Sequence, residues 1–319
     1  MKKNVKVLLI GGKGYIGSTL SKFLFKKKIK CTSIDNLLYE DKISINKKCF
    51  SKISQEFINK FDFIVILAGL VGDPITKKYP KYSHLVNNKL MKKLILKLSN
   101  SDIKKVIFVS TCSNYGLSKS KLLLKENAPL KPLSLYARDK VAIEKYIMKI
   151  KKTKTSFTIL RFATAFGLSK PRMRFDLTLN EFILKAVINK SIDVYDEKTV
   201  RPYCHVQDFS NIIFRILNSR KELTDRQIIN CGFNEYNFSK KKIINLIKKN
   251  YSKKFKVKYE KFSKDKRNYK VDFTKLSNTF NIKSKIDINK KIKEIISYVE
   301  KNKLKINKLK KMGNYNIFR

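Results

Sequence analysis

A threonine, a tyrosine and a lysine have the side chains and spacing needed for acid–base chemistry on an alcohol. Thr111 follows the apolar run 106–109, which predicts a buried strand, so it is expected where that strand ends. Tyr136 and Lys140 lie four residues apart in the helical pattern 134–148, which places both on one helix face. An ammonium near a phenol stabilises the phenolate, the base that alcohol oxidation requires. We therefore interpret these three as candidate catalytic residues.

The amino-terminal residues have the pattern of a phosphate-binding turn. The apolar run 5–10 predicts a buried strand, and it is followed at once by Gly11, Gly14 and Gly17 and then by helical spacing over 18–27. Glycines permit a tight turn and let the backbone approach a pyrophosphate, and the helix amino terminus offers it N–H groups. This arrangement predicts a dinucleotide site.

A second predicted strand, 29–34, ends in Asp35, about where a ribose-binding carboxylate belongs. A carboxylate there accepts hydrogen bonds from ribose hydroxyls and repels a 2′-phosphate, which favours NAD over NADP. A further buried strand, 61–67, ends in small residues past which a cofactor can lie closely. The candidate cofactor-binding residues are Gly11, Gly14, Tyr15, Ile16, Gly17, Asp35, Asn36, Leu67, Ala68, Gly69, Tyr136 and Lys140.

Strand and helix patterns alternate up to about residue 165. A short strand is expected near 49–53, a helix at 83–99 and a strand at 158–162. This rhythm is typical of an α/β fold with a Rossmann-type, doubly wound parallel sheet.

The pattern changes in the second half of the chain, which suggests two domains. We expect an NAD-binding domain at 1–167 that carries the catalytic threonine, tyrosine and lysine. Residues 168–319 are expected to form mainly a smaller α/β lobe that binds substrate, with parts near 200–232 returning to the first domain.

The composition combines an ordinary hydrophobic content with an extreme positive charge. The chain has 319 residues, 43% of them hydrophobic, and a net charge of +48. This hydrophobic content is sufficient for a core. The lysines are scattered along the whole chain and Asn and Ile are also abundant, so we interpret the charge as drift toward A+T-rich codons. Nucleic acid is therefore not expected as a partner, whereas an acidic substrate would be attracted.

Cysteine and histidine usage argues against disulfides and metal centres. The five cysteines are odd in number and widely spaced, and there are only two histidines. The first apolar run is too short for a signal peptide, and no run approaches the roughly 20 apolar residues of a membrane span. We expect a cytoplasmic protein with no membrane partner.

Taken in this order, the motifs resemble the extended short-chain dehydrogenase/reductase family, specifically its NAD-dependent nucleotide-sugar epimerase/dehydratase branch. The glycine loop is similar to the family's Gly-x-x-Gly-x-x-Gly, and the resemblance covers essentially the whole chain. It implies hydride transfer between a sugar carbon and NAD, with Tyr136 as base, Lys140 as its electrostatic partner and Thr111 holding the reacting oxygen. It also implies a homodimer through the helices at 83–99 and 136–148.

Motifs in the second half look like this branch's substrate-side motifs and imply a nucleotide-diphosphate sugar as substrate. They are the loop 171–176, the segment 201–208 and the segment 265–267. Arginines in these motifs are expected to bind the diphosphate. The implied substrate-binding residues are Arg172, Arg174, Asn180, Arg201 and Arg267.

Two departures from the family pattern affect the interpretation. Cys112 and Ser113 stand where the family's dehydratases carry an Asp-Glu pair, so a 4,6-dehydratase is disfavoured. The family's Gly-Asp that meets the adenine is also missing, and the nearest residues are Ile53 and Ser54.

The predicted function is an NAD-dependent nucleotide-sugar epimerase that transiently oxidises a sugar hydroxyl, at C4. A nucleotide-sugar C4 dehydrogenase or reductase with a net redox change is the alternative, because the first half-reaction is the same. A catalytically idle NAD-binding protein and a basic nucleic-acid-binding protein are weaker alternatives, since neither needs Tyr136. His205 and Asn87 are interpreted as structural residues.

Overall fold

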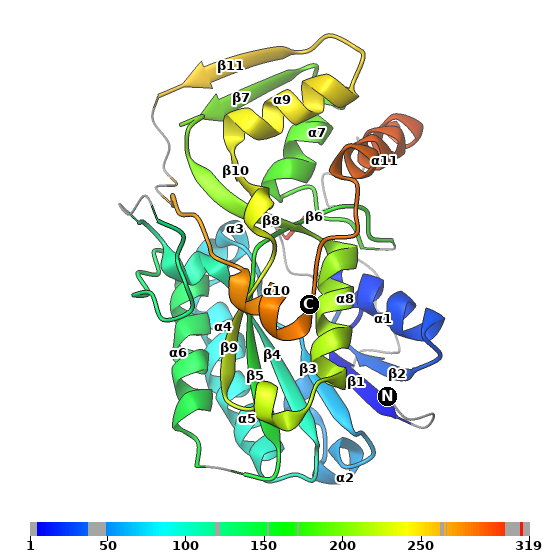
Figure 1. Ribbon diagram of the computed structural model, residues 1–319, viewed down its shortest axis with the longest axis vertical. Coiled ribbons are helices and arrows are strands. Elements are labelled where there is room, and N and C mark those ends of the chain that lie inside the picture. The colour runs from blue at the N-terminus through cyan, green and yellow to red at the C-terminus, as the bar shows by residue number, and fades with distance from the viewer. Residues whose placement is uncertain are drawn as a thin grey trace.

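The computed structural model describes residues 5–37, 49–118, 122–151, 153–170, 172–261, 265, 267–303 and 313–314. Its centre is a six-stranded parallel sheet in the order β2-β1-β3-β4-β5-β9 (Figure 1). This order places crossovers on both faces of the sheet and confirms the predicted Rossmann-type α/β fold. The strands are β1 (Lys6–Ile10), β2 (Lys30–Ile34), β3 (Phe63–Ile66), β4 (Lys105–Thr111), β5 (Ser156–Phe162) and β9 (Gln227–Cys231).

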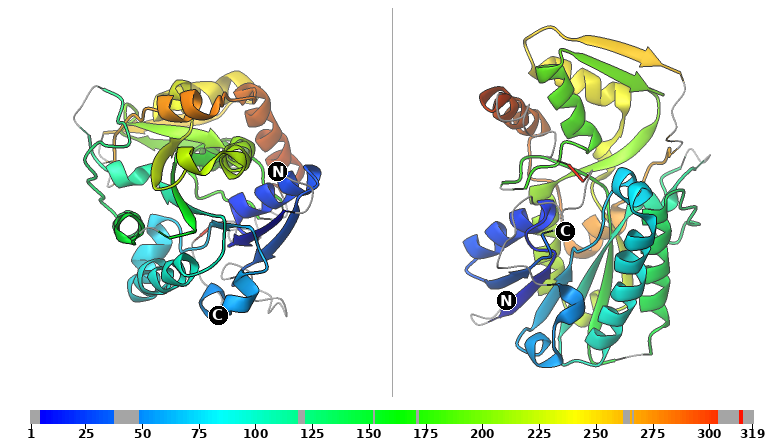
Figure 2. Two further views of the ribbon diagram at one scale, coloured as in Figure 1. Left: turned by 60° about the horizontal axis from the view of Figure 1, so that its bottom comes forward. Right: turned by 180° about the vertical axis from the view of Figure 1, so that it is seen from behind.

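Alternate side chains of the central strands enter two apolar layers, because successive residues of a strand point to opposite faces. Val7 and Leu9 of β1 belong to the layer that contains helices α1 (Tyr15–Lys26) and α8 (Val206–Asn218). Leu8 and Ile10 belong to the layer that contains α5 (Met91–Ser99) and α6 (Leu135–Lys149). Figure 2 shows these helix pairs on opposite sides of the sheet. The sheet is therefore covered on both faces, as its continuous apolar strands require.

The helix expected at 83–99 is part of a longer helical segment. It starts with α4 (Pro80–His84), continues through a π-helical stretch, η2 (Leu85–Leu90), and ends as α5. Pro80 occupies the first helical turn, where its missing N–H removes no intrahelical bond.

The prediction of a strand near 49–53 is wrong. Phe50–Lys52 form a 3₁₀ turn, η1, and the hydroxyl of Ser54 accepts a hydrogen bond from Phe57 N at 3.1 Å. This cap starts α2 (Gln55–Ile58) immediately, so too few residues remain for a strand.

The carboxyl-terminal lobe lies above the carboxyl ends of the sheet strands in Figure 1. It contains a three-stranded sheet, β10-β8-β6, and a two-stranded sheet, β11-β7. The chain returns to the large sheet through α8 and β9, and α10 (Thr274–Phe280) packs against β9. The elements of the carboxyl-terminal lobe are β6 (Thr164–Phe166), α7 (Thr178–Ile188), β7 (Ser191–Tyr195), β8 (Val200–His205), β10 (Asn237–Ser239), α9 (Lys240–Asn250), β11 (Lys256–Glu260) and α11 (Ile288–Lys301).

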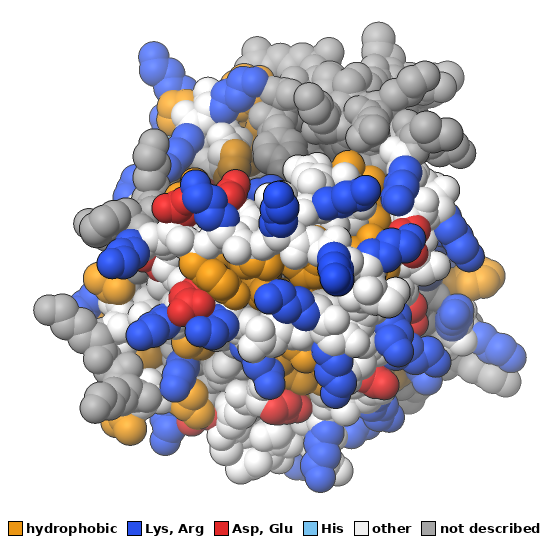
Figure 3. Space-filling view, turned by 90° about the horizontal axis from the view of Figure 1, so that it is seen from above, with side chains coloured by type: hydrophobic (Ala, Val, Ile, Leu, Met, Phe, Trp, Pro, Cys, Tyr) orange, Lys and Arg blue, Asp and Glu red, His pale blue; other side chains and the backbone are white. Residues whose placement is uncertain are grey.

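Basic side chains are dispersed over the face of the molecule that the carboxyl-terminal lobe presents (Figure 3). Figure 3 shows Lys and Arg spread among neutral and apolar side chains across the face of the carboxyl-terminal lobe. Within the described ranges, no helix has the length and apolar character needed to cross a membrane.

Candidate active site

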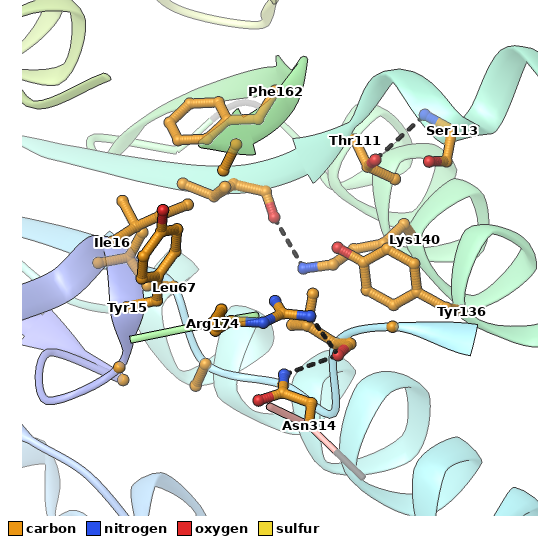
Figure 4. Close-up of a pocket in the computed structure, with 18 of the residues that line it drawn as sticks. Tyr15, Ile16, Leu67, Thr111, Ser113, Tyr136, Lys140, Phe162, Arg174 and Asn314 are labelled. Carbon is orange, nitrogen blue, oxygen red and sulfur yellow. Dashed lines mark hydrogen bonds between the residues drawn. The ribbon is translucent and has the colours of Figure 1, made fainter. Parts of the chain in front are cut away.

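A cavity of about 720 Å³ opens at the carboxyl ends of β1, β3, β4 and β5, where parallel α/β sheets bind their ligands. Residues from the carboxyl-terminal lobe complete its wall. In Figure 4, Tyr15, Ile16 and Leu67 lie across the cavity from Tyr136 and Lys140. Every predicted site residue lines this cavity except Asn180.

The three candidate catalytic residues come from two adjoining elements. Thr111 is the last residue of β4, at the predicted strand end. Its hydroxyl oxygen accepts a hydrogen bond from Ser113 N at 3.1 Å, which leaves the hydroxyl hydrogen to donate toward the cavity. Tyr136 and Lys140 lie in the first two turns of α6, which Ser134 caps by accepting a bond from Ala137 N.

The buried side chain of Lys140 is held in place by a main-chain carbonyl. Its Nζ donates to the carbonyl oxygen of Val109 at 2.7 Å and lies 5.8 Å from the centre of the Tyr136 ring. Burial lowers the pKa of Lys140 to about 8, and the charges of Glu144 and Asp139 oppose this shift. The side chain therefore remains mainly protonated at neutral pH and supplies a positive charge next to the tyrosine.

A buried ionic network fixes α6 against the sheet. Glu144 lies one turn after Lys140, and its Oε2 accepts hydrogen bonds from Nη2 and Nε of Arg161 of β5 at 2.7 Å and 3.1 Å. Both side chains are 3% exposed. The same carboxylate accepts from Ser110 at 2.5 Å and from Asn114 at 2.7 Å, residues on either side of Thr111. Because one carboxylate ties the helix to the strand end, it sets the distance between the threonine and the tyrosine–lysine pair.

The glycine loop meets the geometric needs of a dinucleotide. Gly11 has a φ of +85°, and a Cβ atom built there would lie 2.6 Å from Ala68 N. A Cβ on Gly17 would lie 2.6 Å from Gly11 O, so both positions exclude any larger residue. Gly14 is the N-cap of α1 and supplies no side-chain acceptor, which suits a helix start that receives a phosphate.

The carboxylate of Asp35 is fixed at the end of β2. It accepts from Lys13 N and from Leu37 N, both at 3.0 Å, one bond to each oxygen. Each carboxylate oxygen retains acceptor capacity for a ribose hydroxyl. The glycine loop and the Asp35 carboxylate together fit NAD. Asp35, Tyr136 and Lys140 would hold its ribose groups, and the glycine loop would hold its pyrophosphate.

Two residues missed by sequence reasoning, Cys49 and Phe50, line the cavity. They lie shortly before Ile53 and Ser54, the residues nearest in sequence to the missing Gly-Asp. Phe50 is 8% exposed, and an apolar ring offers a face to a base. No local motif in the sequence marks these two residues. Only their place in the chain, after β2 and the intervening residues 38–48, could have indicated that they line the cavity.

The four predicted substrate-side arginines line the cavity and are all engaged by neighbouring groups. Arg174 pairs with Asp176 through two hydrogen bonds, and Arg172 donates to Asn314 at 2.9 Å. Burial alone would raise the pKa of Asp176, but the charge and hydrogen bonds of Arg174 hold that pKa below its ordinary value. The paired carboxylate is therefore ionised at neutral pH.

The other two arginines form an ionic chain across the cavity wall. Arg201 pairs with Asp265 at 2.5 Å, and Arg267 pairs with Asp265 at 2.7 Å and with Asp73 at 2.6 Å. Burial alone would raise the pKa of Asp265, but the two arginines hold it well below its usual value. Asp73 belongs to α3 (Asp73–Lys78), so the chain links the sheet side of the cavity to the carboxyl-terminal lobe. Sequence reasoning missed Asp73, Asp176 and Asp265, although Asp176 and Asp265 each lie two residues from an arginine.

Asn180 lies behind the cavity wall and is fully buried. Its amide accepts from Gly167 N at 3.1 Å and donates to Arg174 O at 2.9 Å and to Tyr15 at 3.0 Å. These bonds give Asn180 a positioning role for the arginine loop in the described structure. Its predicted contact with substrate stays a prediction.

His205 and Asn87 have the structural roles expected of them. His205 Nδ1 caps α8 by accepting from Gln207 N at 3.2 Å, and burial followed by the charge of Lys291 lowers its pKa to about 3. The amide of Asn87 bonds both the N–H and the carbonyl of Leu70, which ties the loop after β3 to the helical segment.

Sequence comparison finds relatives that are named as nucleotide-sugar enzymes. A UDP-glucose 4-epimerase of Lactobacillus helveticus is 25% identical over 257 residues, covering 72% of this chain and 76% of the relative. A GDP-6-deoxy-D-talose 4-dehydrogenase of Aggregatibacter actinomycetemcomitans is 27% identical over 234 residues, covering 71% and 74%.

Solved structures show the same fold along nearly the whole chain. The UDP-glucuronic acid 4-epimerase of Bacillus cereus, in complex with UDP-glucuronic acid and NAD, has a TM-score of 0.82 at 20% identity and covers 93% of this chain and 99% of its own. TunA, an NAD-dependent NDP-hexosamine 5,6-dehydratase, has a TM-score of 0.81 at 20% identity and covers 93% and 98%. The model of the NAD dependent epimerase/dehydratase family matches residues 7–232, and the chain belongs to that family.

Proposed function

We propose that this protein is an NAD-dependent epimerase that acts at C4 of a nucleotide-linked sugar. The observation that carries this proposal is the meeting of Thr111, Tyr136 and Lys140 in one cavity with a dinucleotide loop and four arginines. The relatives named as 4-epimerases act on UDP-sugars, which makes a UDP-sugar the first substrate to test.

Each catalytic side chain has one task in this proposal. The Tyr136 oxygen takes the proton of the sugar hydroxyl and later returns it, while the Lys140 charge stabilises the phenolate. The Thr111 hydroxyl holds the oxygen at the reacting carbon, because one lone pair accepts from Ser113 N while its hydrogen can donate to a ketone and its second lone pair can accept from an alcohol. NAD, when bound, supplies the acceptance and return of a hydride.

Cys112 is unsuited to the acid–base work of a dehydratase. Its Sγ donates to the Arg161 carbonyl oxygen at 3.2 Å, and burial raises its pKa well above the ordinary value. The side chain therefore stays protonated and turned away from the cavity, so we do not assign a 4,6-dehydration to this chain.

A second candidate is a nucleotide-sugar C4 dehydrogenase with net redox change. The 27% identical 4-dehydrogenase relative favours it, and the first half-reaction requires the same three residues. The decisive assay offers UDP-, GDP-, dTDP- and CDP-sugars and records product stereochemistry together with net NADH. Inversion without NADH supports the epimerase, net NADH supports the dehydrogenase, and no turnover of any sugar refutes both.

Replacing Tyr136 with Phe tests the mechanism directly. The variant lacks only the phenolic oxygen, so we expect it to retain NAD and to lose turnover by about 10²–10⁴-fold. Tyr146→Phe on the same helix is the matched control and should keep full activity. Unchanged turnover in Tyr136→Phe would remove the basis of the mechanism.

We also propose a homodimer through α6 and the helical segment 80–99. Large apolar side chains remain exposed there, with Leu85 at 39%, Leu96 at 50% and Met148 at 41%. A second copy would bury them. Sedimentation equilibrium measures the outcome, and a monomer at micromolar concentration contradicts it.

A further inference from the structure

Gly313 and Asn314, near the carboxyl terminus, lie against the substrate side of the cavity. Asn314 is 4% exposed and lines the cavity wall. Figure 4 shows its side chain beside Arg174, with both groups directed at one carbonyl oxygen. That oxygen belongs to Val71, in the loop between β3 and α3.

The side-chain amide of Asn314 makes hydrogen bonds to two separate parts of the cavity wall. Its Nδ2 donates to Val71 O at 2.7 Å, and its Oδ1 accepts from Arg172 Nη2 at 2.9 Å. The carbonyl of Gly313 accepts from the same arginine nitrogen at 3.3 Å. The main-chain N–H of Asn314 also bonds the carboxylate of Asp176 and helps to lower its pKa. One residue thus joins the β3–α3 loop to both ends of the arginine loop.

The type of this side chain matters as much as its position. An amide oxygen orients a guanidinium by a hydrogen bond but brings no negative charge to it. A carboxylate at the same place would compete with a diphosphate for Arg172. Val71 O also accepts from Arg174 Nη2 at 3.3 Å, so the anchor of Asn314 is shared with the second arginine of the loop.

We propose that Asn314 is a positioning residue that aims Arg172 and Arg174 at the diphosphate of the substrate. Gly313 and Asn314 then form part of the substrate site, although they lie about 140 residues from Arg172 in the chain. This inference rests on the proposed nucleotide-sugar function, because the arginines need an anionic ligand to position for.

The test compares Asn314→Ala, Asn314→Asp and the control Asn302→Ala, which removes an amide at the end of α11. The assay uses the nucleotide sugar that the wild type turns over and measures kcat, KM, bound NAD and inhibition by the free nucleoside diphosphate. For Asn314→Ala we expect KM and the diphosphate inhibition constant to rise together by about tenfold or more, with kcat within twofold. Asn314→Asp should raise both further, and the control should match the wild type.

The outcomes separate the two proposals. An unchanged KM, or a lower one that would make the segment inhibitory, overturns the role of Asn314 while the enzyme assignment stands. A joint loss of kcat, bound NAD and thermal stability also overturns it, since that result describes a structural residue. If the wild type turns over no nucleotide sugar, the proposed function fails, and this inference fails with it.

Discussion

Replacing Lys140 with Met should stabilise the protein while it abolishes turnover. Lys140 is buried, and burial lowers its pKa from 10.5 to about 8. This shift corresponds to a cost of about 3 kcal/mol for keeping the buried side chain charged at pH 7. Methionine has a similar length and carries no charge, so the variant avoids the cost. It loses the hydrogen bond to Val109 O, worth about 1 kcal/mol, which leaves a net gain of about 2 kcal/mol.

The pH dependence of this gain has a definite sign. Between pH 8 and pH 10.5 the unfolded chain holds the lysine proton and the folded chain releases it, so the stability of the wild type rises with pH in that window. The cost of Lys140 is fully present below pH 8 and disappears above pH 10.5. At pH 10 less than about 1 kcal/mol of it remains, so the advantage of the variant should vanish.

The assay is urea unfolding of wild type and variant at pH 7 and pH 10, after bound dinucleotide has been removed. Lys105→Met is the matched control, because burial also lowers the pKa of Lys105 to about 8. Lys105 donates to Ile216 O and Ser219 O at the end of α8, outside the cavity. The control should show the same pH-dependent change in relative stability and keep its turnover. A Lys140→Met variant that is less stable at pH 7, or equally favoured at both pH values, refutes the reasoning.

Two further substitutions test the structure around the site. Arg161→Met should destabilise the fold by about 3–5 kcal/mol, because it removes the guanidinium that pairs with the buried Glu144 carboxylate, and the double variant with Glu144→Leu should recover much of that loss in denaturant unfolding. His205→Asn keeps a capping side chain on α8 but cannot take up a proton. Since the pKa of His205 falls from 6.5 to about 3 on folding, the wild type loses stability as the pH drops below 6.5, and thermal melts at pH 7 and pH 5 should show a smaller loss in the variant.

The sheet and the residues at its strand ends were predictable because their signals are local. A continuous apolar run before Gly11 and another before Thr111 indicate buried parallel strands, and four-residue spacing places Tyr136 and Lys140 on one helix face. The expected strand at 49–53 failed for an equally local reason. The Ser54 cap starts a helix directly after the 3₁₀ turn, where the alternation of strands and helices predicts a strand.

The partners of the arginines were not predictable in the same way. Asp73 and Asn314 reach Arg267 and Arg172 from segments far away in the chain, and only the closed fold brings them together. The bonds of Asn180 were not predictable either. Its amide bonds Gly167, Arg174 and Tyr15 behind the wall, and its place in a substrate-side motif did not indicate these partners.

The arginine pairs explain why the net charge of +48 says little about the site. Asp176 and Asp265 already pair with Arg174, Arg201 and Arg267, so under the proposed function a diphosphate would share these guanidiniums with carboxylates rather than fill a bare positive field. Such sharing depends on geometry, because each guanidinium offers a fixed fork of donors. The dispersed surface lysines attract polyanions without regard to their shape, so discrimination among ligands falls to these few pairs in the cavity wall.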